Sequence, residues 1–368
     1  MYKIPVLDSQ APVNYADTYS KKLLPIIQSY LNGATITVSV KVKKNVINVT
    51  VGVVKNTPTH KLLTKLSDSD FLKEYLLWDR NKQYGYIQKL AKLKSYPTEF
   101  VFKKLNAKVY NKKKIASKAQ PIDHFNTIFN DIFVDQIYDK ISTPPTFDKM
   151  GFIRSTKIRV CPYCGLTIIK PSNKTKHQID HFFPKGKYPF LALSYYNLIP
   201  SCDKCNESPH KGQNDPIEQA AKGKKIQHPY ILNDSIVRFN LRLTGAEIYN
   251  DDNYEVIVGF KDKALLDGYN LFFDTSSRYR NHNVEAAPLY RSHLKFKKSK
   301  GYYAGMNIDH AWLDEAYEYL FNFDPSKNNP WSQEYFRMKV DIFNQLYQTR
   351  KPKPFYTNRS IPNTEMLD

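Results

Sequence analysis

The chain has 368 residues, of which 41% are apolar and 14% aromatic, so it is long enough for two or three folded cores and is not a disordered polypeptide. No apolar run approaches the roughly 18 residues of a membrane span, and no basic-then-apolar leader opens the sequence, so we expect a soluble cytoplasmic protein with reduced cysteines. The formal net charge is +20, and residues 1–120 carry most of it, with 22 Lys or Arg against 7 Asp or Glu. This excess favours an anionic partner such as nucleic acid, although a lysine-rich solvated surface would have the same composition.

The first 120 residues are expected to form a basic α+β region. Apolar periodicity predicts a helix over 19–31. Alternating apolar residues over 36–42 and 47–53 predict a β-hairpin with one apolar face. Aromatic side chains among lysines can stack on nucleobases, but at helical spacing they are more typical of a core. Both interpretations, base stacking and a core, apply to the aromatic residues of a helical pattern that begins at residue 70: Phe71, Tyr75, Trp78, Tyr84 and Tyr86.

Residues 121–160 are expected to form an amphipathic helix and a linker. Apolar residues recur at helical spacing over 122–141, Pro121 suits a first helical turn, and the pattern stops before Pro144. The near-neutral charge of this segment argues against contact with DNA. We therefore expect the helix to pack on a neighbouring domain or on a partner chain.

All four cysteines of the chain fall in two Cys-x-x-Cys pairs, Cys161 with Cys164 and Cys202 with Cys205. Each pair places two thiolates where they can reach one tetrahedral ion, so the two pairs together predict a structural zinc site. Redox dithiols or disulfides are the alternatives. Redox pairs usually occur singly, however, and nothing in the sequence indicates secretion.

Between the two pairs, the alternating segment 177–181 predicts a short strand that ends before Pro184 and places Asp180 and His181 at its end. A carboxylate beside an imidazole suits phosphodiester hydrolysis, because Mg²⁺ prefers oxygen ligands and a neutral imidazole accepts a proton from water. His177 would share a strand face with His181, where it could contact substrate or simply be a polar residue at the rim.

Residues 161–212 resemble the zinc-knuckle branch of the HNH (His-Asn-His, ββα-metal) endonucleases. The order of residues agrees: Cys-x-x-Cys, then Asp-His-x-x-Pro-x-Gly, then Asn-Leu-x-Pro-x-Cys-x-x-Cys-Asn with Lys-Gly beyond. The resemblance implies an α+β fold with a central ββα-metal module at 161–215, framed by the zinc site and flanked by mixed α/β N- and C-terminal regions. It also implies a metal-dependent endonuclease acting on DNA, with an RNA nuclease or a non-catalytic nucleic-acid-binding module as alternatives.

By this resemblance, His181 is the general base, Asp180 binds the catalytic Mg²⁺ or Mn²⁺, and Asn197 on the second strand restrains His181 through a hydrogen bond. The closing His of the family is replaced here by Asn206, whose carbonyl can still bind Mg²⁺. His210 is the alternative ligand if the helix continues to it, which the preceding proline disfavours.

Nucleic acid is the expected partner of this segment. Three lysines could contact phosphates, although lysine is common on any solvated surface: Lys185, Lys187 and Lys211. HNH proteins of similar layout occur in restriction and phage-defence operons, including Septu-like systems in which the nuclease partners an ATPase. Since the chain has no P-loop of its own, a separate ATPase or sensor subunit is an expected partner. The sequence does not decide whether the protein forms an oligomer.

Residues 216–350 are expected to form a C-terminal α+β region, followed by a tail over 351–368. Alternating apolar residues over 237–243 and 254–260 predict a second hairpin. Two further helices are expected at 309–323 and 332–347.

Overall fold

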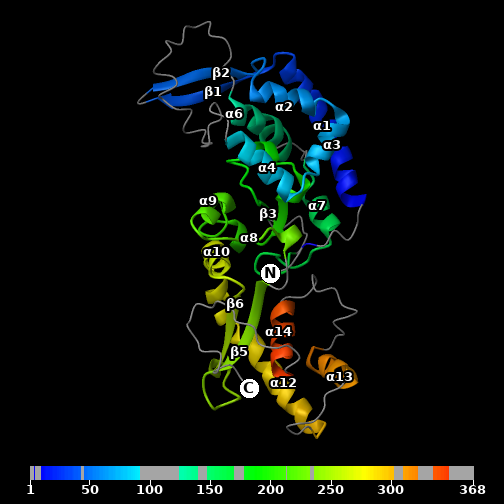
Figure 1. Ribbon diagram of the computed structural model, residues 1–368, viewed down its shortest axis with the longest axis vertical. Coiled ribbons are helices and arrows are strands. Elements are labelled where there is room, and N and C mark those ends of the chain that lie inside the picture. Colours follow the sequence, from blue (N-terminus) through cyan, green and yellow to red (C-terminus); the bar gives the residue numbers. More distant parts are fainter. Residues whose placement is uncertain are drawn as a thin grey trace. The chain divides into compact units, whose positions relative to one another are not determined.

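The computed structural model describes residues 4, 10–42, 45–91, 124–139, 147–169, 178–212, 214–232, 236–301, 310–321 and 335–347, and the predicted tail lies outside these ranges. In the described ranges, helices predominate and the strands form separate two-stranded sheets, which confirms the predicted α+β class (Figure 1). The chain divides into two compact units. The N-terminal unit holds Val6–Thr156 and Ile179–Ile199, and the C-terminal unit holds Met1–Pro5, Lys157–Gln178 and Pro200–Asp368. In the described ranges, no helix combines the length and the apolar character that crossing a membrane requires.

The N-terminal unit is mainly helical. Its helices are α1 (Gln10–Leu31), α2 (Pro58–Leu66), α3 (Ser69–Leu76), α4 (Arg80–Ala91), α6 (Phe125–Phe129), the π-helix η2 (Asn130–Tyr138) and α7 (Lys149–Thr156). The strands β1 (Thr35–Val42) and β2 (Asn45–Gly52) form the predicted antiparallel hairpin, with Val38 opposite Val49. The aromatic pattern from residue 70 is divided between α3 and α4 rather than forming one helix, and α2 was not predicted.

Helix α1 begins earlier than the predicted residue 19, because its buried positions continue at helical spacing back to Pro12 and Tyr15. The Tyr15 ring packs against Tyr195 at 5.2 Å between centroids, and its hydroxyl donates to the Leu193 carbonyl at 2.8 Å. The Tyr75 hydroxyl of α3 donates in the same way to the Phe190 carbonyl at 2.6 Å. These two tyrosines tie the segment 179–199 to the helices that precede it.

The segment 179–199 supplies most of a small two-stranded motif. β3 (Gln178–His181) and β4 (Leu198–Ser201) form a two-stranded sheet, with the 3-10 turns η3 (Pro189–Leu191) and η4 (Tyr195–Asn197) between them. The one-turn helix α8 (Asp203–Asn206) follows β4. The order of elements is therefore strand, strand, helix, as the ββα resemblance predicts.

The C-terminal unit is built around the second predicted hairpin, in which β5 (Val237–Leu243) pairs antiparallel with β6 (Tyr254–Phe260). Its remaining elements are α9 (Pro216–Ala221), η5 (Pro229–Ile231), η7 (Asp251–Asn253), α10 (Lys263–Phe273), α11 (Thr275–Arg280), α12 (Asn283–Ser299), α13 (His310–Phe321) and α14 (Phe336–Leu346). Gly268 in α10 is required by close packing, because a Cβ there would lie 1.9 Å from the Lys225 carbonyl oxygen. Helices α10, α11 and α12 were not predicted.

Helix α14 covers the free edge of β5. Asp341 accepts a hydrogen bond from the Phe239 N–H at 3.2 Å. Gln345 accepts from the Leu241 N–H at 2.8 Å and donates to the Leu241 carbonyl at 2.9 Å. An exposed edge would leave these backbone groups available to another strand, so the two side chains close the sheet on that side.

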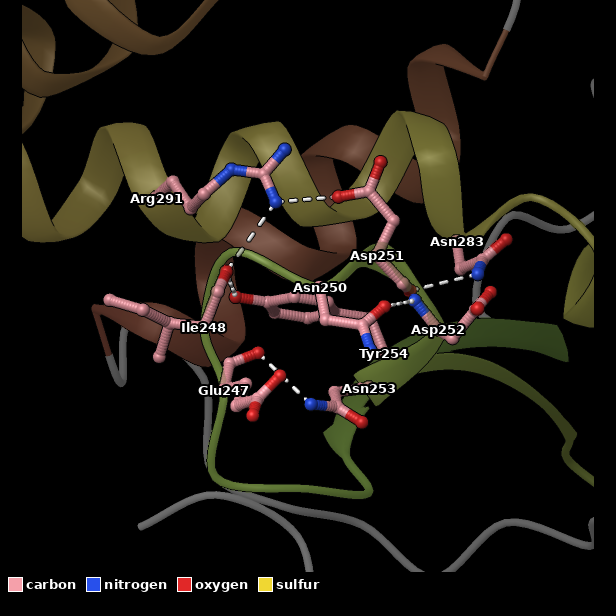
Figure 2. A network of polar contacts seen from close by, with 9 residues as sticks. All are labelled: Glu247, Ile248, Asn250, Asp251, Asp252, Asn253, Tyr254, Asn283 and Arg291. Atoms are coloured by element: carbon pink, nitrogen blue, oxygen red, sulfur yellow. Dashed lines mark hydrogen bonds and ion pairs between the residues drawn. The ribbon is translucent and has the colours of Figure 1, made fainter.

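A polar network fixes the connection between β5 and β6 to α12 (Figure 2). Arg291 of α12 forms an ion pair with Asp251 at 2.5 Å, and Asn283 donates to the Asp251 carbonyl at 2.8 Å. On the loop itself, the Tyr254 hydroxyl donates to the Ile248 carbonyl at 2.6 Å. Two positions of the loop, Ile248 and Asp251, are thus bonded to α12, which fixes the hairpin to this helix.

Candidate functional site

The two Cys-x-x-Cys pairs form tight turns in the C-terminal unit. In the first turn the Gly165 N–H donates to the Cys161 carbonyl at 2.8 Å, and the Leu166 N–H donates to the Cys164 sulfur at 3.4 Å. Gly165 has a φ of 70°, a conformation in which glycine carries no steric penalty. In the second turn Cys202 caps α8, and the Cys205 N–H donates to the Cys202 carbonyl at 3.0 Å. Each turn therefore directs two sulfur atoms to one side.

The four sulfur atoms lie within 4.8 Å of one another, all four cysteines are buried, and none is in a disulfide. A tetrahedral zinc ion with Zn–S bonds of about 2.3 Å separates its sulfur ligands by about 3.8 Å. The Cys164 and Cys202 sulfurs are 3.9 Å apart. The predicted thiols are thus brought together, and the cluster could hold zinc.

Arg278 of α11 is the cationic partner of this cluster, and sequence reasoning did not identify it. Its guanidinium donates to the Cys205 sulfur at 3.3 Å. Burial raises the pKa of Cys164, but hydrogen bonds from the other thiols and the charge of Arg278 outweigh burial and hold that pKa well below its ordinary value. A hydrogen bond with Cys161 also lowers the pKa of Cys202, whereas burial and hydrogen bonds with the other thiols raise the pKa of Cys161 and of Cys205 well above the ordinary value. Cys164 and Cys202 therefore favour the thiolate form that a metal ion requires.

In the N-terminal unit, β3 carries Asp180 and His181, whose exposed fractions are only 3% and 6%. The His181 Nε2 lies 3.0 Å from the Ala192 carbonyl oxygen. A carbonyl oxygen only accepts hydrogen bonds, so Nε2 carries the proton and, in a neutral imidazole, Nδ1 carries the lone pair. This tautomer leaves Nδ1 as the basic atom of the ring.

Asn197 is fully buried and ends the turn before β4. Its side-chain oxygen accepts from the Phe183 N–H at 2.8 Å, and its amide donates to the carbonyls of Phe183 and Leu191 at 3.2 and 3.1 Å. These bonds fix the connection that carries Ala192, the hydrogen-bond partner of His181. The side chain of Asn197 thus bonds to the connection next to His181 and not to His181 itself, whereas the resemblance implies a direct hydrogen bond. A restraint of His181 by Asn197 stays a prediction.

Tyr138, the last residue of η2, packs against His181 with the two rings edge to face, 4.6 Å between centroids. The ammonium groups of Lys149 and Lys185 lie 4.8 and 4.7 Å from the centre of the Tyr138 ring. Lys185 also pairs with Asp139. Two cations thus lie on the tyrosine that buttresses His181. Tyr138 and Lys149 had no sequence motif, and the only signal for Tyr138 was its place at the end of an amphipathic helix.

The remaining predicted residues are placed as follows. His177 lies outside the described residues, and Lys187 is partly exposed. Asn206 ends α8, and residues 207–212 are not helical. His210 is therefore not one helical turn away from Asn206 on the same face. Lys211 is fully buried, unlike an exposed phosphate-binding lysine.

Comparison with known proteins matches the stretch of sequence that holds these residues. The family model described as HNH endonuclease matches residues 161–212. The chain is similar to the Septu protein PtuB of Bacillus thuringiensis, with 29% identity over 97 residues, which is 26% of this chain and 35% of that protein. It is also similar to Protein ea31 of Escherichia phage lambda, with 37% identity over 78 residues, 21% of this chain and 23% of that protein.

The chain thus covers about a third or less of the length of these two relatives. No solved structure gives a significant match. The family match, the clustered cysteines and the order of two strands and a helix all fall on the same stretch of sequence. Residues 161–212 therefore are the stretch of this chain that matches the HNH endonuclease family.

Proposed function

We propose that this protein is a metal-dependent endonuclease that hydrolyses phosphodiester bonds in DNA. The observation that carries the proposal is the hydrogen bond from His181 Nε2 to the Ala192 carbonyl, inside a segment that matches the HNH family. It favours the tautomer with the proton on Nε2 and the lone pair on Nδ1, and a general base needs such a lone pair.

In the proposed reaction, His181 Nδ1 takes a proton from a water molecule as its oxygen attacks phosphorus. The bond between phosphorus and the 3′ oxygen breaks, and that oxygen gains a proton from solvent. The products carry 5′-phosphate and 3′-hydroxyl ends. The Tyr138 ring and the Ala192 carbonyl hold the imidazole in place during the proton transfer.

Asp180 and Asn206 are the proposed ligands of a catalytic Mg²⁺ or Mn²⁺, with His210 as the alternative to Asn206. A carboxylate and an amide carbonyl are the oxygen donors that these ions prefer. The ion, when bound, would stabilise negative charge on the scissile phosphate and the departing oxygen. Zinc is the proposed ion of the four cysteines, which supply the all-sulfur set typical of structural zinc sites.

The lysines around Tyr138 support an anionic substrate. Lys149 is exposed, and Lys185, which pairs with Asp139, is partly exposed, so both side chains lie at the surface beside Tyr138. The excess of positive charge in residues 1–120 would add a salt-dependent attraction to the polyanion. We propose that Lys185 and Lys187 contact the backbone of the substrate, together with Lys149, and keep His177 and Lys211 as weaker candidates.

The similarity to the Septu protein supports a role in bacterial defence. We propose that a separate ATPase or sensor subunit controls cleavage, in the cytoplasm. Co-expression of the chain with the products of its neighbouring genes, followed by affinity purification, tests this. Cleavage that needs the co-purified subunit and its nucleotide is expected, and full activity of the isolated chain would contradict such control.

The nuclease is tested by plasmid cleavage with the wild type and with His181→Ala and Asp180→Asn, each with Mg²⁺, with Mn²⁺ or with EDTA. Metal-dependent cutting that both variants lose is expected. Asp203→Asn is a matched control, because it removes an exposed acid from α8 and should cut at the wild-type rate. Ligation of the products by DNA ligase without further treatment checks the predicted ends.

Cutting by His181→Ala at the wild-type rate would refute the assigned base. Cleavage of RNA in preference to DNA under the same conditions would show that RNA, and not DNA, is the substrate. Absence of cutting by the wild type, both alone and with the neighbouring subunits, would favour a non-catalytic binding module, for which Asn206 in place of the family's last His is the supporting feature.

A further inference from the structure

The N-terminal unit contains a cavity of about 880 Å³, which is lined by residues of α2, α3 and α4 and of the turns beside them. This volume lies within the range of roughly 300–1,000 Å³ that is usual for ligand sites. The cavity is separate from the residues that surround His181. It is lined by Asn56, Pro58, His60, Lys61, Leu62, Thr64, Lys65, Phe71, Trp78, Tyr86, Lys89 and Leu90.

One wall of the cavity is aromatic. Trp78 is half-buried, and its ring lies 4.6 Å from the fully buried Tyr75, 5.4 Å from Tyr86 and 6.4 Å from Phe71. Contact with Tyr75 fixes the indole against the core, while Trp78, Tyr86 and Phe71 keep part of their surface open to the cavity. The wall offers a flat, fixed, apolar surface to a planar ligand.

The mouth of the cavity is cationic. Lys61, Lys65 and Lys89 are exposed, and none of them pairs with an acidic side chain in the described ranges. No lining residue is acidic. Two lysines of the same helices that do not line the cavity are, by contrast, neutralised: Lys73 pairs with Asp17 at 2.9 Å and Lys82 with Glu74 at 2.8 Å. The uncompensated charge is thus concentrated where the aromatic wall opens.

We propose that this cavity binds an unpaired nucleotide of the DNA strand, with its base stacked on Trp78 and neighbouring phosphates on Lys65 and Lys89. Every base has a flat face that can stack on an aromatic side chain, and the phosphates on either side supply the matching charge. A base inside a duplex has both faces covered by its neighbours, so the site selects single-stranded DNA. The choice of DNA rests on the proposed function, whereas the location of the site rests on the cavity.

The cavity also shares a structural element with the catalytic segment. The Tyr86 ring packs edge to face on Phe190 at 5.8 Å, and Phe190 accepts the hydrogen bond from Tyr75. Phe190 lies in the same connection that Asn197 fixes and that carries Ala192. A strand held in the cavity is therefore held against the segment that orients His181.

The test measures binding of fluorescently labelled single-stranded and duplex oligonucleotides by anisotropy. All proteins carry His181→Ala and no divalent ion is added, so cleavage does not interfere. The double variant Lys65→Gln/Lys89→Gln should bind the single strand about tenfold or more weakly, and the slope of log affinity against log salt should fall by about 1.4, since each single-strand phosphate contributes about 0.7. Lys73→Gln/Lys82→Gln is the matched control, because it removes the same charge from α3 and α4 outside the cavity, and it should bind within about twofold of the parent.

A second measurement does not depend on a variant. An oligonucleotide with 5-iodouracil is cross-linked by light, and mass spectrometry should find the adduct on the peptide that contains Trp78 or Tyr86. The proposal is overturned if the control variant loses as much affinity as the cavity variant, if duplex binds as tightly as single strand, or if the adduct maps elsewhere. Displacement of the strand by free thymidine monophosphate at equal concentration would also overturn it, in favour of a site for free nucleotides. If this binding pattern holds and no plasmid cleavage is ever found, the proposed nuclease fails and the cavity assignment stands.

Discussion

Asn197→Ala is the substitution that most directly tests how the site is held together. The change removes three hydrogen bonds with the backbone of Phe183 and Leu191 at a fully buried position. A buried polar group that loses its partner costs about 1–3 kcal/mol. Three such groups predict a loss of at least about 3 kcal/mol in the stability of the N-terminal unit. A shift of the connection that carries Ala192 would misplace His181, and a displacement of about 1 Å can lower a rate on the order of 100-fold.

Two assays measure these effects on the same protein. Urea unfolding followed by circular dichroism gives the loss of stability, and initial rates of plasmid cleavage give the loss of activity under conditions where the variant is folded. Asn81→Ala, an exposed asparagine on α4, is the control and should change stability by no more than about 0.5 kcal/mol. Wild-type stability of Asn197→Ala would refute the hydrogen-bond argument, and reduced stability with an unchanged cleavage rate would refute the link to His181.

Three further predictions follow from the described contacts. Arg278→Met should lower zinc affinity by about 10–100-fold in a chelator competition, because the cluster loses the cation on the Cys205 sulfur, and unchanged affinity would show that the contact is incidental. Tyr138→Phe should cut DNA at nearly the wild-type rate while Tyr138→Ala should lose at least about tenfold, since the ring rather than the hydroxyl packs on His181; equal rates would contradict this. Burial, with the charge of Lys297, lowers the pKa of His293 to about 4. The neutral imidazole therefore contributes its full share to the free energy of unfolding above the unfolded pKa near 6.5. That contribution falls by about 1.4 kcal/mol per pH unit as the pH drops from there to about 4. The urea concentration at the unfolding midpoint should therefore decrease when the pH is lowered from about 7.5 to about 5, and it should decrease much less in His293→Gln than in the wild type. An equal decrease in the two proteins would refute the assignment.

The sequence predicted those features that depend on local spacing. The two hairpins are confirmed because alternating apolar residues reveal a strand with one buried face without knowledge of its neighbours. The cysteine cluster is confirmed because Cys-x-x-Cys fixes two ligands within one turn. Features that depend on tertiary contacts were not predictable. Tyr138 reaches His181, and Arg278 reaches Cys205, across long stretches of chain with no motif of their own.

Missed helices have physical explanations of the same kind. Helix α12 contains Pro288 in its interior, and proline is read from sequence as a helix end. Helix α10 buries one face at helical spacing, but it is only 11 residues long and has Gly268 in its interior, and glycine disfavours a helix when it is read from sequence. The predicted boundaries of a domain at 161–215 remain a prediction. Contacts within the structure place residues 179–199 in the same compact unit as the N-terminal helices.

This grouping makes the nuclease domain unsuitable for excision. A fragment comprising residues 161–212 would keep the cysteines but lose the tyrosines that hold its middle, Tyr15 on Leu193 and Tyr75 on Phe190. Its segment 189–193 is almost completely buried in the intact chain and would be exposed to water in the fragment. Grafting the motif onto another scaffold would therefore require transplanting the supporting helices with it. During synthesis, likewise, the N-terminal unit cannot complete its core until residue 199 has left the ribosome.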